Sequence, residues 1–136
     1  GLAQGAYILA EAGESPPEVI LIATGSEVSL ALQAHAQLAG DGIRSRVVSM
    51  PCWELFERQP ESYRDTVLPP SVRARVSIEA AAPFGWERYV GLDGAMISVA
   101  DFGASAPGPV VMREFGFTPE HVIEAAKRML QLSRRQ

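Results

Sequence analysis

The sequence predicts an α/β protein: a three-layer α/β/α sandwich around a mostly parallel five-stranded sheet with one antiparallel edge strand. Two observations lead to this class. Short apolar runs alternate along the chain with segments of helical periodicity, which is typical of a sheet between helical layers. The run Val19–Ala23 is apolar on consecutive residues, as in a parallel strand that is covered on both faces.

The first half of the chain predicts two strands, a helix and a third strand. Residues 5–10 predict a short strand, and the polar, proline-rich residues 11–17 predict the turn after it. Val19–Ala23 is the second strand, and residues 43–50 are the third, which Pro51 ends. A strand, a helix and a strand in this order predict a right-handed parallel crossover. The helix between them shows one face at helical spacing: Val28, Ala31, Leu32, His35, Leu38 and Ala39.

The second half predicts short helices, two more strands and a long final helix. Residues 53–67 carry a helical pattern that Pro60 interrupts, so we expect two short helices. Residues 73–78 and 95–99 predict strands, and residues 84–90 a short helix. The last helix has sequence signals at both ends. Thr118 is placed to cap its N-terminus, and Pro119 suits the first helical position. Arg134 and Arg135 complement the negative end of the helix dipole. Its buried stripe consists of Val122, Ile123, Ala126, Met129 and Leu130.

Length and composition limit the classes of function. A chain of 136 residues without repeats or low-complexity tracts forms one domain, residues 1–136, and buries a core without disulfides. The net charge of -4 argues against a nucleic-acid partner, which needs clustered Lys and Arg. No apolar run approaches the roughly 20 residues that cross a bilayer, so no membrane partner is expected. The single cysteine, Cys52, fits a reducing, cytoplasmic setting.

Residues 24–27 (TGSE) join a strand to a helix, as phosphate-binding loops do. The segment lacks GxGxxG as well as GxxxxGKS and GxxxxGKT, so it misses the glycines and the lysine that approach phosphates. Thr24 and Glu27 match a capping box instead, in which each side chain accepts a hydrogen bond from the other residue's amide. We therefore interpret the segment as a structural corner.

The carboxyl ends of the predicted parallel strands bring several polar residues to one edge of the sheet, where open α/β folds bind ligands. This edge is the candidate site, and a partner domain that covers it is the alternative. His35, on the apolar face of a helix, is a hydrogen-bonded core or edge histidine in our interpretation, and neither it nor His121 suits a general base. No residue is assigned a catalytic, cofactor-binding or metal-binding role. The edge residues are Thr24, Ser26, Cys52, Glu79, Asp101 and Ser105.

Several segments together resemble the C-terminal domain of transketolase, over nearly the whole chain. Two phrases separate transketolase from related thiamine enzymes: SMP at residues 49–51, and FG-x-SAP before EFGFT at residues 102–118. The resemblance is carried by LIATGSEVSLALQA (21–34), GIRSRVVSMPCWELFERQ (42–59), YRDTVLPPSVRARVSIEA (63–80), YVGLDGAMISVADFGASAP (89–107) and EFGFTPEHVIEAAKRML (114–130).

The resemblance implies a parent enzyme of three α/β domains, and the start at Gly1 rather than Met agrees with a fragment of a longer chain. Such a parent moves a two-carbon ketol unit from a ketose phosphate to an aldose phosphate, in the pentose phosphate pathway. The family holds thiamine diphosphate and a divalent metal, Mg or Ca, between the first two domains of a homodimer. The third domain is then a non-catalytic scaffold whose partners are the other two domains and a second subunit.

Two other assignments stay open at this point. One is the corresponding domain of a 1-deoxyxylulose-phosphate synthase or of a 2-oxo-acid dehydrogenase β subunit, against which the FG-x-SAP and EFGFT phrases argue. The other is a free-standing regulatory module that binds a small anion at the strand ends.

Overall fold

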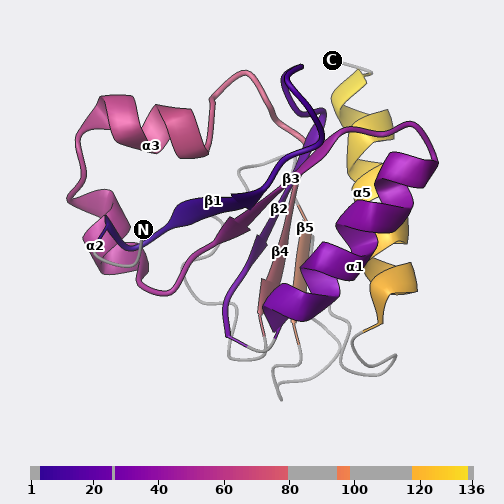
Figure 1. Cartoon of the computed structure of the whole chain (residues 1–136), viewed down its shortest axis with the longest axis horizontal. Coiled ribbons are helices and arrows are strands. Elements are labelled where there is room, and N and C mark those ends of the chain that lie inside the picture. Colours follow the sequence, from indigo (N-terminus) through magenta and orange to yellow (C-terminus); the bar gives the residue numbers. More distant parts are fainter. Residues whose placement is uncertain (1–3, 26, 80–94, 99–117, 135–136) are drawn as a thin grey trace.

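The protein is an α/β sandwich around a mixed sheet in the order β1-β3-β2-β4-β5 (Figure 1). The structure is a computed structural model that describes residues 4–25, 27–79, 95–98 and 118–134. The edge strand β1 pairs antiparallel with β3, and the other pairs are parallel, which confirms the predicted fold class. The strands are β1 (Tyr7–Ala10), β2 (Val19–Ala23), β3 (Ser45–Ser49), β4 (Arg75–Glu79) and β5 (Ala95–Ser98).

The central strand β2 shows why the consecutive apolar run predicts a sheet that is covered on both sides. All five of its residues are fully buried. Successive side chains of a strand point to opposite faces. Accordingly Leu21 joins a core cluster on one face, and Ile20 and Ile22 join a second cluster on the other.

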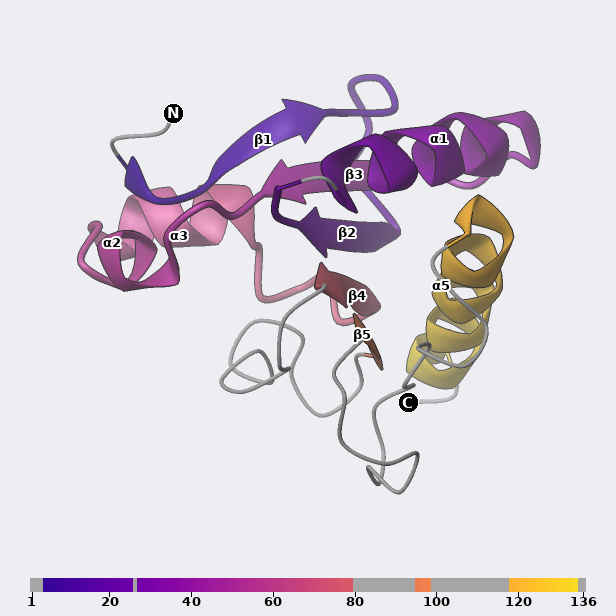
Figure 2. The same cartoon turned by 90° about the horizontal axis from the view of Figure 1, so that it is seen from below.

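The first helical layer consists of α1 (Glu27–Gly40) and α5 (Pro119–Arg134), which lie on the same face of the sheet (Figure 2). The predicted stripe of α5 is confirmed except that Ala125 is also buried and Ile123 only partly. The predicted face of α1 is wrong at Leu32 and Ala39, which are exposed. The buried stripe follows spacings of three and four residues through Ala31, Ala34 and Leu38, so Leu32 and Ala39 are turned away from the sheet.

The second layer consists of the two short helices predicted from the proline break, α2 (Trp53–Glu57) and α3 (Glu61–Val67). They lie on the opposite face of the sheet from α1 and α5 (Figure 1). Phe56 and Val67 are buried against the sheet residues of the second cluster. The Phe56 and Tyr63 rings meet edge to face with centroids 6.3 Å apart, which joins the two helices.

Two arginines on the sheet also hold this second layer. The Arg46 guanidinium pairs with both carboxylate oxygens of Glu11, at 2.9 and 2.8 Å, and donates to the main-chain oxygens of Thr66 and Val67. Arg75, on β4, donates to the main-chain oxygens of the segment that leads from α3 to β4. Burial lowers the pKa of Arg75, although a guanidinium remains charged in proteins.

The helix predicted for residues 84–90 lies outside the described part of the chain, as do the loops that follow β4 and β5. Among the helices that the structure describes, none has the length and apolar character that a bilayer crossing requires.

Candidate functional site

The parallel strands end together, as the sequence predicts. Ala23 is in register with Ser49 on one side and with Ile78 on the other, and Glu79 is in register with Ser98. Thr24 and the backbone of Glu79 therefore lie at the same edge of the sheet. Of the other predicted edge residues, Ser26, Asp101 and Ser105 lie outside the described residues.

The corner between β2 and α1 closes through main-chain hydrogen bonds. The Glu27 amide donates to the main-chain oxygen of Thr24 at 3.2 Å, and the Val28 amide donates to that of Gly25 at 3.2 Å. Gly25 has a φ of 57°, a left-handed conformation that glycine adopts without steric cost. Two amides at the helix start are thus already bonded inside the corner, while the side-chain bonds of the capping box stay a prediction.

The main chain of Cys52 is hydrogen-bonded to the beginning of the chain and to α2. Its amide donates to the Gly5 oxygen at 3.0 Å, and its own carbonyl accepts from the Phe56 amide at 3.2 Å, where α2 begins. Gly5 packs so closely here that a Cβ would collide with the Cys52 oxygen and the Phe56 nitrogen. The thiol is half-buried and unbridged.

Both histidines contact hydroxyl groups. Nδ1 of His35 lies 2.6 Å from Oγ of Ser45 on β3, which confirms the interpretation of His35 as a hydrogen-bonded histidine. Nδ1 of His121 lies 2.9 Å from Oγ1 of Thr118, and the same oxygen accepts from the His121 amide at 3.3 Å, as a helix cap does. Within the described ranges, no three His, Cys, Asp or Glu side chains gather as metal ligands would.

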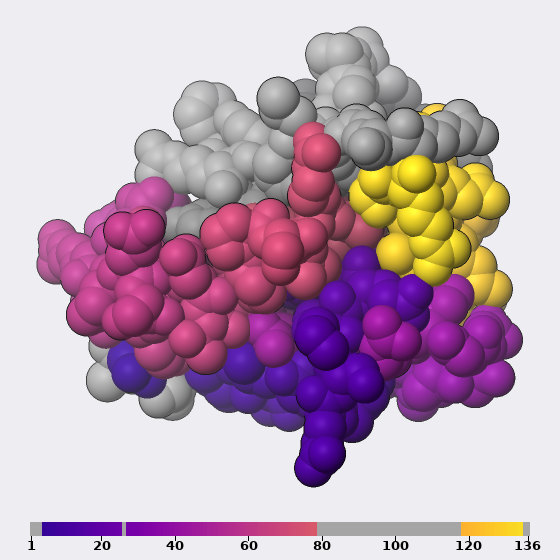
Figure 3. All heavy atoms as spheres, turned by 90° about the horizontal axis from the view of Figure 1, so that it is seen from above, coloured from indigo at the N-terminus to yellow at the C-terminus, as the bar shows by residue number. Residues whose placement is uncertain are grey.

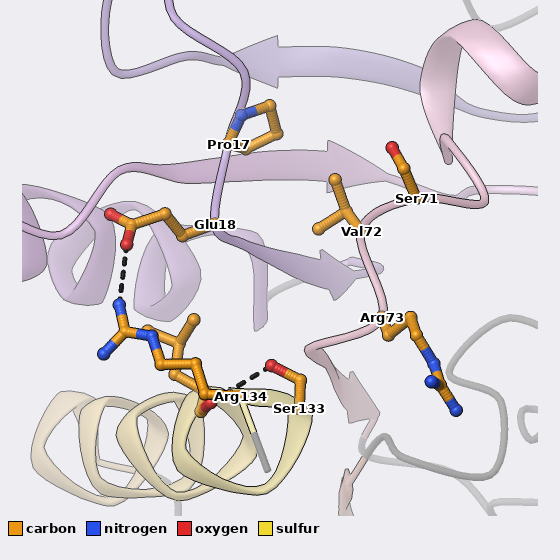
Figure 4. A pocket seen from close by; sticks show the side chains of 8 residues that line it. Pro17, Glu18, Ser71, Val72, Arg73, Ser133 and Arg134 are labelled. Carbon is orange, nitrogen blue, oxygen red and sulfur yellow. Dashed lines mark hydrogen bonds and ion pairs between the residues drawn. The ribbon is translucent and has the colours of Figure 1, made fainter. Parts of the chain in front are cut away.

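A hollow of about 260 Å³ lies at the opposite, amino edge of the sheet (Figure 4). Three segments form it: the end of the turn before β2, the loop before β4, and the last turns of α5. At its rim, Arg134 from α5 donates to Oε2 of Glu18 at 2.8 Å. The Arg44 amide donates to Oε1 of Glu18 at 3.0 Å, and this bond is the main cause that lowers the pKa of Glu18.

Sequence reasoning missed this hollow, and the chain carries no local signal for it. Glu18 and Arg134 are 116 positions apart, and the residues around each follow ordinary strand and helix patterns.

Comparison with known proteins gives a consistent result. Residues 5–118 match the family described as the transketolase-like TK C-terminal domain. The chain is similar to the transketolase of Geobacillus stearothermophilus, with 51% identity over 96% of this chain and 20% of that protein. The chain thus spans about a fifth of the length of the curated relatives that it matches.

Solved structures show the same likeness. The transketolase from Leishmania mexicana superposes with a TM-score of 0.79 at 42% identity, over 96% of this chain and 18% of that one. A transketolase variant from Pichia stipitis, in complex with xylulose 5-phosphate, superposes with a TM-score of 0.81 at 36% identity, over 99% and 19%.

Proposed function

The chain belongs to the transketolase family as its C-terminal domain, and from this premise we propose that residues 1–136 form one non-catalytic domain of a longer enzyme. The parent transfers a two-carbon ketol unit from a ketose phosphate to an aldose phosphate in the pentose phosphate pathway, in the cytoplasm. The observation that carries the proposal is the similarity over 96% of the chain to a transketolase five times as long. The ketose phosphate in the Pichia stipitis complex is consistent with this substrate class.

The cofactor is held elsewhere in the parent. Thiamine diphosphate is bound through a divalent metal, Mg or Ca, which needs several oxygen ligands around its diphosphate. The donor set found here does not fit: in the described ranges no ligand cluster occurs, and the two histidines contact Ser45 and Thr118. The corner after β2 also has two of its first amides bonded internally. We therefore assign cofactor binding to the other two domains.

The role of this domain is to support those domains and the second subunit of a homodimer. Helices already cover both faces of the sheet, which leaves the edges for contact with the rest of the parent. At the carboxyl edge, Thr24 is half-buried and Gly25 is exposed, so this corner offers main-chain and small side-chain surface to another protein. We assign the interface to this edge.

An assay of ketol transfer from xylulose 5-phosphate to ribose 5-phosphate tests the proposed function. The full-length parent should catalyse this transfer, whereas the 136-residue chain should show only background activity. Calorimetry of the chain with thiamine diphosphate and magnesium should show no saturable heat. Saturable binding in the micromolar range by the chain, or a parent without ketol transfer, would overturn the proposal.

A matched pair of variants in the parent tests the interface. Thr24→Arg places a long charged side chain at the carboxyl edge, and we expect it to weaken the dimer in sedimentation. Thr66→Arg makes the same change at an exposed position on α3 and should leave the dimer intact. If both variants sediment like the unmodified parent, the interface lies elsewhere.

A further inference from the structure

The outer surface of α1 differs from that of α5, although both helices lie in the same layer. No Asp, Glu, Lys or Arg occurs between residues 28 and 40, so none of the exposed residues of α1 carries a formal charge. The exposed part of α5, in contrast, includes Glu120, Glu124, Lys127, Arg128 and Arg134. Helix faces that are turned to water normally carry charged side chains, as α5 does. The outer surface of α1 therefore lacks the composition of a solvated surface.

Leu32 is the largest apolar side chain on this outer surface, and it is 37% exposed. His35, one turn later, contacts Ser45 at the start of β3, whereas Asp41 on the other flank of α1 pairs with Lys127 of α5. Residues three positions apart lie on the same side of a helix. Leu32 therefore lies with His35 on the flank that is turned away from α5, toward β3 and the edge strand β1.

The edge strand β1 continues this surface with a second exposed leucine. Leu32 precedes His35 by roughly 5 Å along α1, and Val47 follows Ser45 by roughly 7 Å along β3, which runs in the opposite direction. Leu32 is thus nearly level with Val47, whose register partner on β1 is Ala10. Leu9 lies next to Ala10, at the bulge, and is 39% exposed. Figures 2 and 3 show β1 and α1 along the same side of the molecule.

The point at which the chain enters the domain indicates what covers this surface. β1 is the first element, and Gly5, just before it, packs against the backbone of Cys52 and Phe56. About four fifths of the length of a transketolase relative lies outside this C-terminal domain. In the proposed parent, that part precedes the domain and joins it at this fixed point beside β1. A tethered partner is present at a high effective concentration, so an apolar surface of modest size is enough for docking.

We propose that the α1–β1 surface, formed by Leu9, Leu32, Ala36 and Ala39, docks against the domain that precedes this one in the parent enzyme. The inference rests on the proposed function and adds a second contact surface, apart from the carboxyl edge. The facing surface of the partner is apolar at its centre, because an ionised side chain opposite Leu32 would lose its water without gaining a counter-charge. Ala36 and Ala39 are small and exposed, so the partner can approach the backbone of α1 closely.

Hydroxyl-radical footprinting of the full-length parent and of the 136-residue chain tests the proposal. Oxidation of Leu32 and Leu9 should be about fivefold slower in the parent, because a docked protein surface excludes water. Leu132 is the matched control: it is also 37% exposed but lies on the charged helix α5, and its oxidation rate should be the same in both proteins. Equal oxidation of Leu32 in the two proteins, or equal slowing of Leu32 and Leu132, would overturn the proposal. Protection of Leu32 that grows with the concentration of the chain alone would assign the surface to a second copy and would also overturn it.

A matched pair of variants separates docking from effects on the fold. In the parent, Leu32→Glu places a carboxylate in the docked surface and should speed protease cleavage at the junction before β1 about tenfold. Leu132→Glu should leave that rate unchanged. In the 136-residue chain, both variants should unfold at the same urea concentration as the unmodified chain, because a glutamate at either exposed position reaches water. A Leu32→Glu parent that is cleaved like the unmodified parent would contradict the docking.

Ketol transfer is measured on the same preparations of the unmodified parent. An inactive parent would refute the proposed function. An active parent in which Leu32 is oxidised as fast as in the chain would refute only the docking of the α1–β1 surface.

Discussion

The two faces of the sheet are covered in different ways. On one face, α1 and α5 pack through apolar side chains, among them Ala31, Ala34 and Ala126, which are fully buried. On the other face, α2 and α3 pack on the sheet through an apolar cluster, and guanidinium groups of the sheet donate to main-chain oxygens of α3 and of the segment after it. Arg46, one of these groups, is only 8% exposed.

Helix length explains the difference. Helices of 14 and 16 residues, such as α1 and α5, carry an apolar stripe through several turns. Helices of 5 and 7 residues, such as α2 and α3, are too short to be stable alone and leave a larger share of carbonyls without an intrahelical partner. Arg46 on the sheet supplies donors for two carbonyls of α3, and Gly5 packs against the backbone at the start of α2. The layer of short helices therefore depends on specific polar contacts and close backbone packing.

The largest effect should come from the close packing beside α2. Gly5→Ala should destabilise the fold by about 4 kcal/mol, because the added Cβ collides with the backbone at Cys52 and Phe56 and the φ of 86° is strained for alanine. The measurement is urea unfolding of the chain. Gly13→Ala is the matched control: its φ is 96° and a Cβ there meets nothing within 4 Å, so it should cost only about 1 kcal/mol. If the two substitutions lowered the unfolding free energy equally, the collision at Gly5 would not be the cause of the loss.

The buried arginine should come next. Arg46→Met keeps much of the apolar stem but leaves the oxygens of Thr66 and Val67 without this donor, so we expect a loss of about 2 kcal/mol. Arg44→Met removes an arginine whose side chain is 44% exposed and should cost less than about 1 kcal/mol. Leu38→Met on the other face should cost less than about 1.5 kcal/mol, because the volume is conserved. An Arg46→Met variant as stable as Arg44→Met would show that the apolar cluster alone holds α2 and α3.

The helices on both faces could be predicted from the sequence, but the polar contacts that hold the second face could not. Apolar residues at helical spacing identified α5, and a run of consecutive apolar residues identified the buried strand β2, because packing constrains the residue type at each position. The Arg46 contacts produce no such pattern of residue types in the sequence. Its partner Glu11 lies 35 positions away, and its other acceptors are main-chain oxygens, which any residue supplies.

The two edges of the sheet also differ in how far the sequence predicts them. The gathering of Thr24 and Glu79 follows from strand direction alone, so it could be predicted. The amino-edge hollow depends on where the end of α5 meets Glu18, which is a matter of tertiary packing.

A smaller effect should come from the polar start of α5, on the otherwise apolar face. Thr118→Ala removes the oxygen that accepts from the His121 amide, and the unfolding free energy should fall by about 1 kcal/mol. Thr66→Ala is the matched control on α3. Its hydroxyl donates to the Ser62 oxygen at an exposed site inside the helix, so the change should be within about 0.5 kcal/mol. A Thr118→Ala variant that unfolds like Thr66→Ala would mean that the cap contributes nothing measurable.

The smallest effect should be the pH-dependent contribution of Glu18, which links the start of β2 to α5. The hydrogen bond from the Arg44 amide is the largest cause that lowers the pKa of Glu18 below its ordinary 4.5. Burial opposes it as the second-largest cause, and the charge of Arg44 and the hydrogen bond and charge of Arg134 add smaller lowering effects. Because the folded pKa is the lower one, the contribution is present above pH 4.5 and is lost as the pH falls through the folded value. Glu18→Gln should therefore cost less than about 1 kcal/mol at about pH 7 and almost nothing at about pH 2. High salt should remove the part due to Arg134, whose side chain is 64% exposed, and keep the part due to the amide. An equal difference in unfolding free energy between Glu18→Gln and the unmodified chain at both pH values would contradict this account.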